Sequence, residues 1–232
     1  MEKTPLLKNE EENINCLTYT DKFNIIIMGE RGVGKTELLK NLSKINSSKF
    51  KIITPENDNQ TNKFNENNNI IERISLEFTS EEKEYLIKIW NYCYISDTRL
   101  INDFMHKADA FIIVYSIIDK SSFNNINSWI IETKNKTSSK KIKFYIIGNK
   151  SDKINERQVG VDELRQFCEK ENFKFFEISS LNNIDLEECF NDIFLEIINI
   201  NYTDTEYSQL SSGEENKNKK ICSCCKKYCN IF

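Results

Sequence analysis

The stretch GERGVGKT, residues 29–36, has glycines, a lysine and a threonine at the spacing G-x-x-x-x-G-K-[ST]. Glycines let backbone N–H groups converge on phosphate oxygens, and a following helix presents its positive N-terminal end. Lys35 can add a positive charge at the terminal phosphates, and the Thr36 hydroxyl can bind Mg²⁺. The alternative interpretation is a glycine-rich turn that holds a lysine by chance. The predicted polyphosphate site consists of Gly29, Glu30, Arg31, Gly32, Val33, Gly34, Lys35 and Thr36.

A second stretch, IIGNKSD, can select the base of a nucleotide. Asn149, Lys150 and Asp152 follow a buried apolar run, so we expect them at the carboxyl end of a strand, where α/β sheets bind ligands. A carboxylate there can accept two hydrogen bonds from a guanine edge, which adenine cannot supply. In isolation these letters fit a polar turn equally well. Their position after a phosphate loop and before EISSL, residues 177–181, favours guanine.

The elements that must position these residues are strands alternating with helices. Apolar runs of strand length lie at 22–29, 71–78, 85–90, 110–117, 143–148 and 173–180. Apolar residues at helical spacing lie at 35–45, 122–133, 161–172 and 185–200. The alternation predicts an α/β fold, with a mostly parallel six-stranded sheet and helices on both faces.

Composition excludes several classes of protein. A net charge of −4 and a pI near 5.4 argue against nucleic acid as a partner. The sequence contains no run of 18 apolar residues, so no membrane-spanning helix is predicted. The first residues lack the features of a secretory signal, and Glu2 excludes N-myristoylation. We therefore expect the eight cysteines to remain reduced in the cytosol.

Shifts in composition divide the chain into three parts. Residues 1–20 are charged and Asn-rich, which predicts a flexible N-terminal arm. Residues 21–200 are the predicted nucleotide-binding domain, with a mobile Asn-rich insertion at 57–69. Residues 201–232 turn polar and then rich in Lys and Cys, which predicts a hypervariable tail.

Over about residues 22–198 the sequence resembles the Ras-superfamily small GTPases, and specifically the Rab branch. Beyond the short motifs, DKSSFNNINSWI and RQVGVDELRQFCEKENFKFFEISS are similar to stretches typical of Rab proteins. The resemblance implies the P-loop small-GTPase fold and a switch that binds GTP and GDP with Mg²⁺ and acts in vesicle traffic. It also implies that the last nucleotide loop lies near the base through Ser179, Ser180 and Leu181.

The first switch loop of the family supplies a Mg²⁺-binding threonine, and Thr54 falls at that spacing after Thr36. Pro55 follows at once, so Thr61 is a rival, and an ordinary surface role for Thr54 is an equal alternative. The resemblance implies an effector-facing segment made of Lys51, Ile52, Ile53, Thr54, Pro55, Glu56, Asn57, Asp58 and Asn59.

The second switch departs from the family sequence Trp-Asp-Thr-Ala-Gly-Gln. The matching residues here are Trp90, Asn91, Tyr92, Cys93, Tyr94 and Ile95. Asn91 replaces an acidic residue near Mg²⁺, so a full negative charge is lost. Tyr94 replaces the glycine that senses the γ-phosphate, and Ile95 replaces the glutamine that orients the attacking water. The contacts to the nucleotide, including the one from Asn91, are expected to be kept. No catalytic residue is intact.

These departures predict slow or absent intrinsic GTP hydrolysis. Arg31, where Rab proteins usually have a small residue, could crowd the γ-phosphate, act as an arginine finger supplied in cis, or be a solvated side chain. A second hypothesis is a GTP-locked or nucleotide-indifferent interaction scaffold. A third, a P-loop ATPase or kinase, conflicts with the GNKSD stretch.

The last four residues, CNIF, fit the C-a-a-X pattern for geranylgeranylation of Cys229. One lipid holds a membrane only marginally, so a second signal is expected, and Cys224 and Cys225 are candidates for a second lipid. A zinc cluster is the alternative, but the cysteine spacing lacks paired C-x-x-C knuckles. By family resemblance the partners are effectors, an exchange factor, the prenylation machinery and a GDP-dissociation-inhibitor-type chaperone. The expected location is the cytoplasmic side of a membrane, with a cytosolic pool.

Overall fold

The computed structural model describes residues 19–45, 47–53, 64–65, 70–71, 73–92, 105–137 and 142–211 of the chain. In these residues strands and helices alternate from β7 onward, as the sequence predicts, whereas β2 to β6 follow one another as strands. The chain divides into two units, Met1–Cys189 and Phe190–Phe232, and the whole main sheet lies in the first unit.

The main sheet has seven strands in the order β2-β5-β6-β1-β7-β8-β9. From β6 to β9 neighbouring strands are parallel, whereas β5 pairs antiparallel with both β2 and β6. The strands are β1 (Asp21–Met28), β2 (Phe50–Ile52), β5 (Arg73–Ser80), β6 (Lys83–Asn91), β7 (Ala110–Ser116), β8 (Lys143–Asn149) and β9 (Lys174–Glu177). The carboxyl ends of the parallel strands therefore meet at one edge of the sheet.

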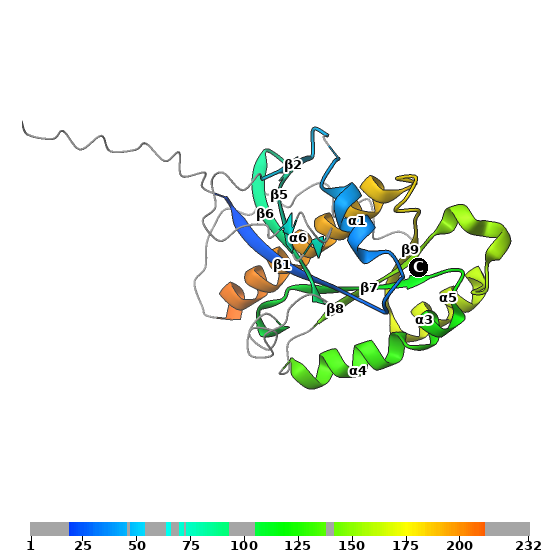
Figure 1. Ribbon diagram of the computed structural model, residues 1–232. Helices are drawn as coiled ribbons and strands as arrows, with labels where there is room; N and C mark the ends of the chain where they lie inside the picture. Colours follow the sequence, from blue (N-terminus) through cyan, green and yellow to red (C-terminus); the bar gives the residue numbers. More distant parts are fainter. Residues whose placement is uncertain are drawn as a thin grey trace, which may run out of the picture. The chain divides into compact units, whose positions relative to one another are not determined.

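Helices cover both faces of this sheet, as expected from the alternation. Figure 1 shows α3, α4 and α5 on one side and α1 on the other. The helices are α1 (Lys35–Leu42), α3 (Lys120–Asn124), α4 (Ile126–Lys136), α5 (Val161–Glu171) and α6 (Leu186–Ser211), with a 3-10 helix at Ser151–Glu156. The predicted α/β class with a mostly parallel sheet is confirmed.

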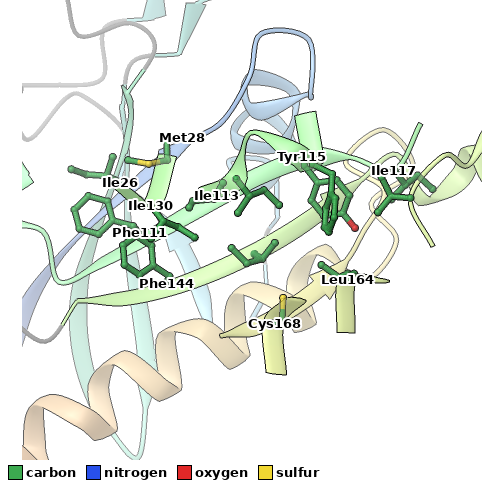
Figure 2. Packing of buried hydrophobic residues seen from close by; sticks show 14 of the residues in the cluster. Ile26, Met28, Phe111, Ile113, Tyr115, Ile117, Ile130, Phe144, Leu164 and Cys168 are labelled. Carbon is green, nitrogen blue, oxygen red and sulfur yellow. The ribbon is translucent and has the colours of Figure 1, made fainter. Parts of the chain in front are cut away.

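Strand β7 lies between β1 and β8 in the interior of the sheet and is buried along its whole length. Phe111 and Ile113 of β7 pack in one cluster with Ile130 of α4 and with Leu164 and Cys168 of α5 (Figure 2). A run that is apolar on both faces is typical of a central parallel strand, because helices cover it from both sides. This cluster holds the parallel strands in place, and with them the loops at their carboxyl ends.

The prediction of six strands is wrong by one, because it omits β2. This strand has three residues and pairs antiparallel with β5, with Phe50 opposite Phe78 and Ile52 opposite Leu76. Phe50 is buried, and its ring lies 5.5 Å from that of Phe78. A three-residue strand is too short for an alternation pattern, so its existence depends on tertiary packing.

Two further segments differ in extent from the sequence expectations. Helix α6 continues to Ser211, past the boundary expected at residue 200. Residues 201–211 are polar, which suggested a tail, but extending an existing helix costs far less than starting one. Within the 57–69 segment, Phe64–Asn65 forms β3, which pairs antiparallel with β4 (Ile70–Ile71). Residues 1–18 and 212–232 lie outside the described part of the chain.

Candidate functional site

The predicted phosphate loop connects β1 to α1, and its glycines have backbone angles that suit glycine alone. The φ angles are 134° at Gly29, 86° at Gly32 and 101° at Gly34. A Cβ on Gly29 would lie 2.1 Å from the Val114 carbonyl oxygen, and one on Gly34 would lie 2.2 Å from Nδ2 of Asn149. Both the backbone conformation and the lack of space therefore require glycine at residues 29 and 34. A Cβ added to Gly32 would have open space around it, so only the φ angle favours glycine there.

Lys35 lies at the start of α1 and is buried, with only 6% of its surface exposed. Its ammonium group donates hydrogen bonds to the carbonyl oxygens of Gly29 at 2.6 Å and Glu30 at 2.7 Å. The positive charge is thus held against the loop. Thr36 follows in the first turn of α1 and is half-buried, and Arg31 is exposed.

Asn149, at the end of β8, connects the phosphate loop to the loop after β9. Its Nδ2 donates to the Val33 carbonyl oxygen at 2.8 Å and to Ser180 Oγ at 2.9 Å. Its Oδ1 accepts from the Ser180 backbone N–H at 3.0 Å. Asn149 is 1% exposed, so these contacts lie away from solvent. The structure thus brings together residues from three separate sequence motifs.

Asp152 follows Asn149 closely and is half-buried. The Ser179 hydroxyl donates a hydrogen bond of 2.5 Å to its carboxylate, which fixes the orientation of that group. Lys150, between them, has a φ of 67° and turns the chain out of the strand. Leu181, predicted to lie near a base, is 65% exposed. The Asp152 carboxylate can accept hydrogen bonds from a ligand that presents N–H donors.

The first residue of the altered second switch that is not part of β6 is Tyr92, and it is anchored to α4. Its hydroxyl donates to Glu132 at 2.6 Å and accepts from the Lys136 ammonium at 2.9 Å. Its ring meets that of Trp129 edge to face, with centroids 6.0 Å apart. Burial raises the pKa of Tyr92, and the hydrogen bond to Glu132 raises that pKa further. Asn91, just before it, ends β6 and is fully buried.

Several predicted residues lie outside the described part of the chain. Lys51 and Ile52 of the effector-facing segment are in β2, and Lys51 pairs with Glu77 at 3.4 Å. Ile53 follows β2. The residues outside are Thr54, Pro55, Glu56, Asn57, Asp58, Asn59, Thr61, Cys93, Tyr94, Ile95, Cys224, Cys225 and Cys229.

Polar contacts that no motif indicates complete the arrangement. Asn125, between α3 and α4, donates to the Glu30 carboxylate of the phosphate loop at 3.1 Å. Asn41 of α1 donates to the Ser180 carbonyl oxygen at 2.5 Å. The only hint in the sequence is the low helix propensity of asparagine, which makes Asn41 an unfavourable choice within a helix unless a tertiary contact compensates.

Comparison with known proteins identifies the family. The Ras family model matches residues 24–199. The chain is 28% identical over 181 residues to Ras-related protein Rab-11B of Dictyostelium discoideum, covering 78% of this chain and 76% of that protein. It is 26% identical over 183 residues to GTP-binding protein ypt3 of Schizosaccharomyces pombe, covering 78% of each. The chain therefore belongs to the Ras family of small GTPases, in its Rab branch.

Replacing Gly34 by Ala is expected to destabilise the protein by about 1–3 kcal/mol, because the added methyl group combines an unfavourable φ with a clash against Asn149. Gly160→Ala is the matched control, since Gly160 has a φ of −71° and open space around it. Gly160 is the N-cap residue of α5, where alanine is less favourable than glycine, so that change is expected to lower the free energy of unfolding by less than about 1 kcal/mol. Urea unfolding of both variants measures the difference, and equal midpoints would contradict the proposed close approach.

Proposed function

We propose that the protein binds guanine nucleotides with Mg²⁺ and acts as a membrane-anchored Rab-type switch in vesicle traffic, with slow or absent intrinsic GTP hydrolysis. The observation that carries the nucleotide proposal is the Asn149 amide, which connects Val33 of the phosphate loop to Ser180. It brings a glycine loop suited to phosphates and a carboxylate suited to guanine to one edge of the sheet. Membership of the Ras family supports the same assignment.

Guanine selection is assigned to Asp152. Guanine presents two adjacent N–H donors, and an ionised carboxylate has enough lone pairs to accept both while also accepting from Ser179. Adenine presents no such pair and would leave the carboxylate unsatisfied, which is costly in a partly buried site. Lys35 is assigned to the β- and γ-phosphates, and the backbone N–H groups of residues 29–36 to the remaining phosphate oxygens.

The residues available to hold Mg²⁺ are neutral. Thr36 offers a hydroxyl oxygen and Asn91 an amide oxygen, and Thr54 is the candidate from the first switch. Mg²⁺ prefers several oxygen ligands and keeps part of its water shell, so phosphate oxygens and water would have to supply most of its coordination and all of its countercharge. This donor set fits Mg²⁺ in the presence of a nucleotide. It also predicts that the protein contributes less to Mg²⁺ binding than it would with an aspartate among the ligands.

Slow hydrolysis is supported by the second switch. Ile95 cannot hydrogen-bond an attacking water, and Tyr94 occupies the place of a glycine. The contacts of Tyr92 with Glu132, Lys136 and Trp129 fix the start of this segment on α4. A second switch that is fixed there is expected to respond little to the nucleotide. These contacts of Tyr92 are therefore the observation that favours the second candidate, the interaction scaffold.

Membrane attachment is proposed through the C-terminal cysteines. Geranylgeranyl on Cys229 with a second lipid on Cys224 or Cys225 would give the two signals that stable anchoring needs. Among the described residues, no helix is both long and apolar enough to cross a membrane. The proposed partners are effectors, an exchange factor, the prenylation machinery and a GDP-dissociation-inhibitor-type chaperone, and the proposed location is the cytoplasmic side of a membrane with a cytosolic pool.

Asp152→Asn is expected to weaken GDP binding by about 100-fold or more, because one carboxylate oxygen becomes an N–H donor that faces a guanine donor. The same change is expected to improve binding of xanthosine diphosphate, whose 2-oxo group accepts from that amide. Asp162→Asn is the control, since Asp162 is an exposed residue of α5 that pairs with Arg165. Fluorescent nucleotide titrations measure both preferences. Unchanged GDP affinity in Asp152→Asn would rule out guanine recognition by this carboxylate.

Single-turnover hydrolysis of bound GTP is expected to be at least about tenfold slower than in a Rab protein with the complete Trp-Asp-Thr-Ala-Gly-Gln sequence, because no residue remains to orient the water. Guanine nucleotide content is quantified at the start of the reaction. A rate equal to that of the reference protein would overturn the proposal of slow hydrolysis. Finding that the purified protein binds no nucleotide would move the scaffold hypothesis to first place.

Cys229→Ser is expected to move most of the protein from the membrane fraction to the cytosol, because it removes the sole prenylation site of the C-a-a-X pattern. Fractionation of eukaryotic cells that express the full chain measures this distribution. Cys16→Ser, far from the tail in sequence, is the control and should leave the distribution unchanged. Retention of Cys229→Ser on membranes at the wild-type level would contradict anchoring through this cysteine.

A further inference from the structure

Helix α1 carries a buried asparagine in its last turn. Asn41 is 6% exposed, and both hydrogens of its amide are used. One donates to the Ser180 carbonyl oxygen at 2.5 Å and the other to the Glu37 carboxylate at 3.2 Å. Its Oδ1 accepts from the Lys44 ammonium at 3.1 Å. The contacts on Nδ2 and Oδ1 distinguish the two ends of the amide, so they fix one orientation of the side chain.

Ser180, the partner of Asn41, is held at each of its polar atoms. Asn149 accepts from its backbone N–H at 3.0 Å and donates to its Oγ at 2.9 Å. Asn41 donates to its carbonyl oxygen. Ser180 is 4% exposed, so water cannot easily replace any of these partners. Two asparagines from separate elements, one in β8 and one in α1, thus fix the position of this residue.

These contacts form a closed ring. Asn149 connects Val33 to Ser180, Asn41 connects Ser180 to α1, and α1 returns to the phosphate loop through the bond from the Leu38 N–H to the Gly34 carbonyl oxygen at 2.9 Å. The predicted phosphate loop and the predicted base loop are therefore held by two connections. Asn149 belongs to the recognition motif, whereas Asn41 belongs to none.

We propose that Asn41 is a positioning residue for guanine selection, an inference that rests on the proposed nucleotide-binding function. By holding the Ser180 carbonyl, Asn41 fixes the 179–181 loop against α1. The neighbouring Ser179 hydroxyl holds the Asp152 carboxylate, so the orientation of that carboxylate depends on the same loop. The hydrogen bonds of the Asn41 side chain go to Ser180, Glu37 and Lys44, so its loss acts first on the 179–181 loop, next to the proposed base site.

Loss of Asn41 leaves the buried Ser180 carbonyl without its side-chain donor, and the loop is expected to shift to recover one. Asp152 then accepts less well from the guanine 2-amino group. Inosine diphosphate lacks that group and serves as the probe. A base-specific role lowers the preference for GDP over inosine diphosphate. A merely structural role speeds the release of both nucleotides by the same factor.

The experiment measures release rates of GDP and inosine diphosphate from the full chain in the presence of Mg²⁺. Asn41→Leu, which keeps the volume, is expected to speed GDP release roughly fivefold to tenfold and to lower the GDP preference about threefold, as loss of one hydrogen bond allows. Asn41→Asp keeps the size and the oxygen that faces Lys44 but cannot donate to Ser180, so it is expected to lower the preference in the same way. The two variants keep the size of the side chain but differ in polarity, so a change that both share is assigned to the lost hydrogen bond and not to a folding defect.

The control variant lies on the same helix. Lys40→Ala removes a side chain that is 43% exposed and pairs only loosely with Glu37 at 4.0 Å. It is expected to keep the wild-type preference. Wild-type preference in both Asn41 variants, with GDP bound tightly by the wild-type protein, would overturn this inference alone. Failure of the wild-type protein to bind GDP would overturn the proposed function, and this inference with it.

Discussion

The side-chain amide of Asn149 makes the contacts on which the arrangement of the site depends. Val33 is 116 residues away from it in the sequence and Ser180 is 31 residues away, yet each receives a hydrogen bond from the same nitrogen. Such a contact requires a very close approach of the loops, and Gly34 makes that approach possible because any Cβ there would overlap Asn149. A neutral hydrogen bond contributes only about 0.5–1.5 kcal/mol, but a buried group without its partner costs about 1–3 kcal/mol. The network therefore adds little to the overall stability of the protein, but any other arrangement of these loops would leave buried polar groups without partners and would cost more.

The hydrogen bonds of this network keep their geometry because the strands that carry them are closely packed. Strands β1, β7 and β8 lie side by side and are buried, and their carboxyl ends carry the phosphate loop, Ser116 and Asn149. Close-packed apolar side chains such as Phe111 and Ile113 keep the strands from sliding along one another. A one-residue slip of β8 would move Asn149 to the opposite face and break all of its contacts. Precise polar geometry at the edge thus follows from apolar packing in the interior.

The sequence predicts the parts of this protein whose chemistry is local. The glycine loop, the apolar strands and the GNKSD stretch each have a pattern set by neighbouring residues, and the predicted fold class and family follow from them. Strand β2 was missed because three residues carry no periodicity, and its place depends on Phe50 meeting Phe78 across the sheet. The roles of Asn41 and Tyr92 were missed because their partners, Ser180 and Glu132, are distant in the sequence. The polar appearance of residues 201–211 likewise gave no sign of the helix that continues through them.

Strand β2 also has a consequence for self-association. It lies at one end of the main sheet and pairs with Leu76, Glu77 and Phe78, three of the eight residues of β5. A strand of three residues offers another sheet very few groups to pair with, and the Lys51 side chain on it is exposed and charged. Short, charged outermost strands are the usual means by which proteins avoid joining sheets edge to edge. The three residues of β2 are thus a poor template for pairing with the sheet of another molecule.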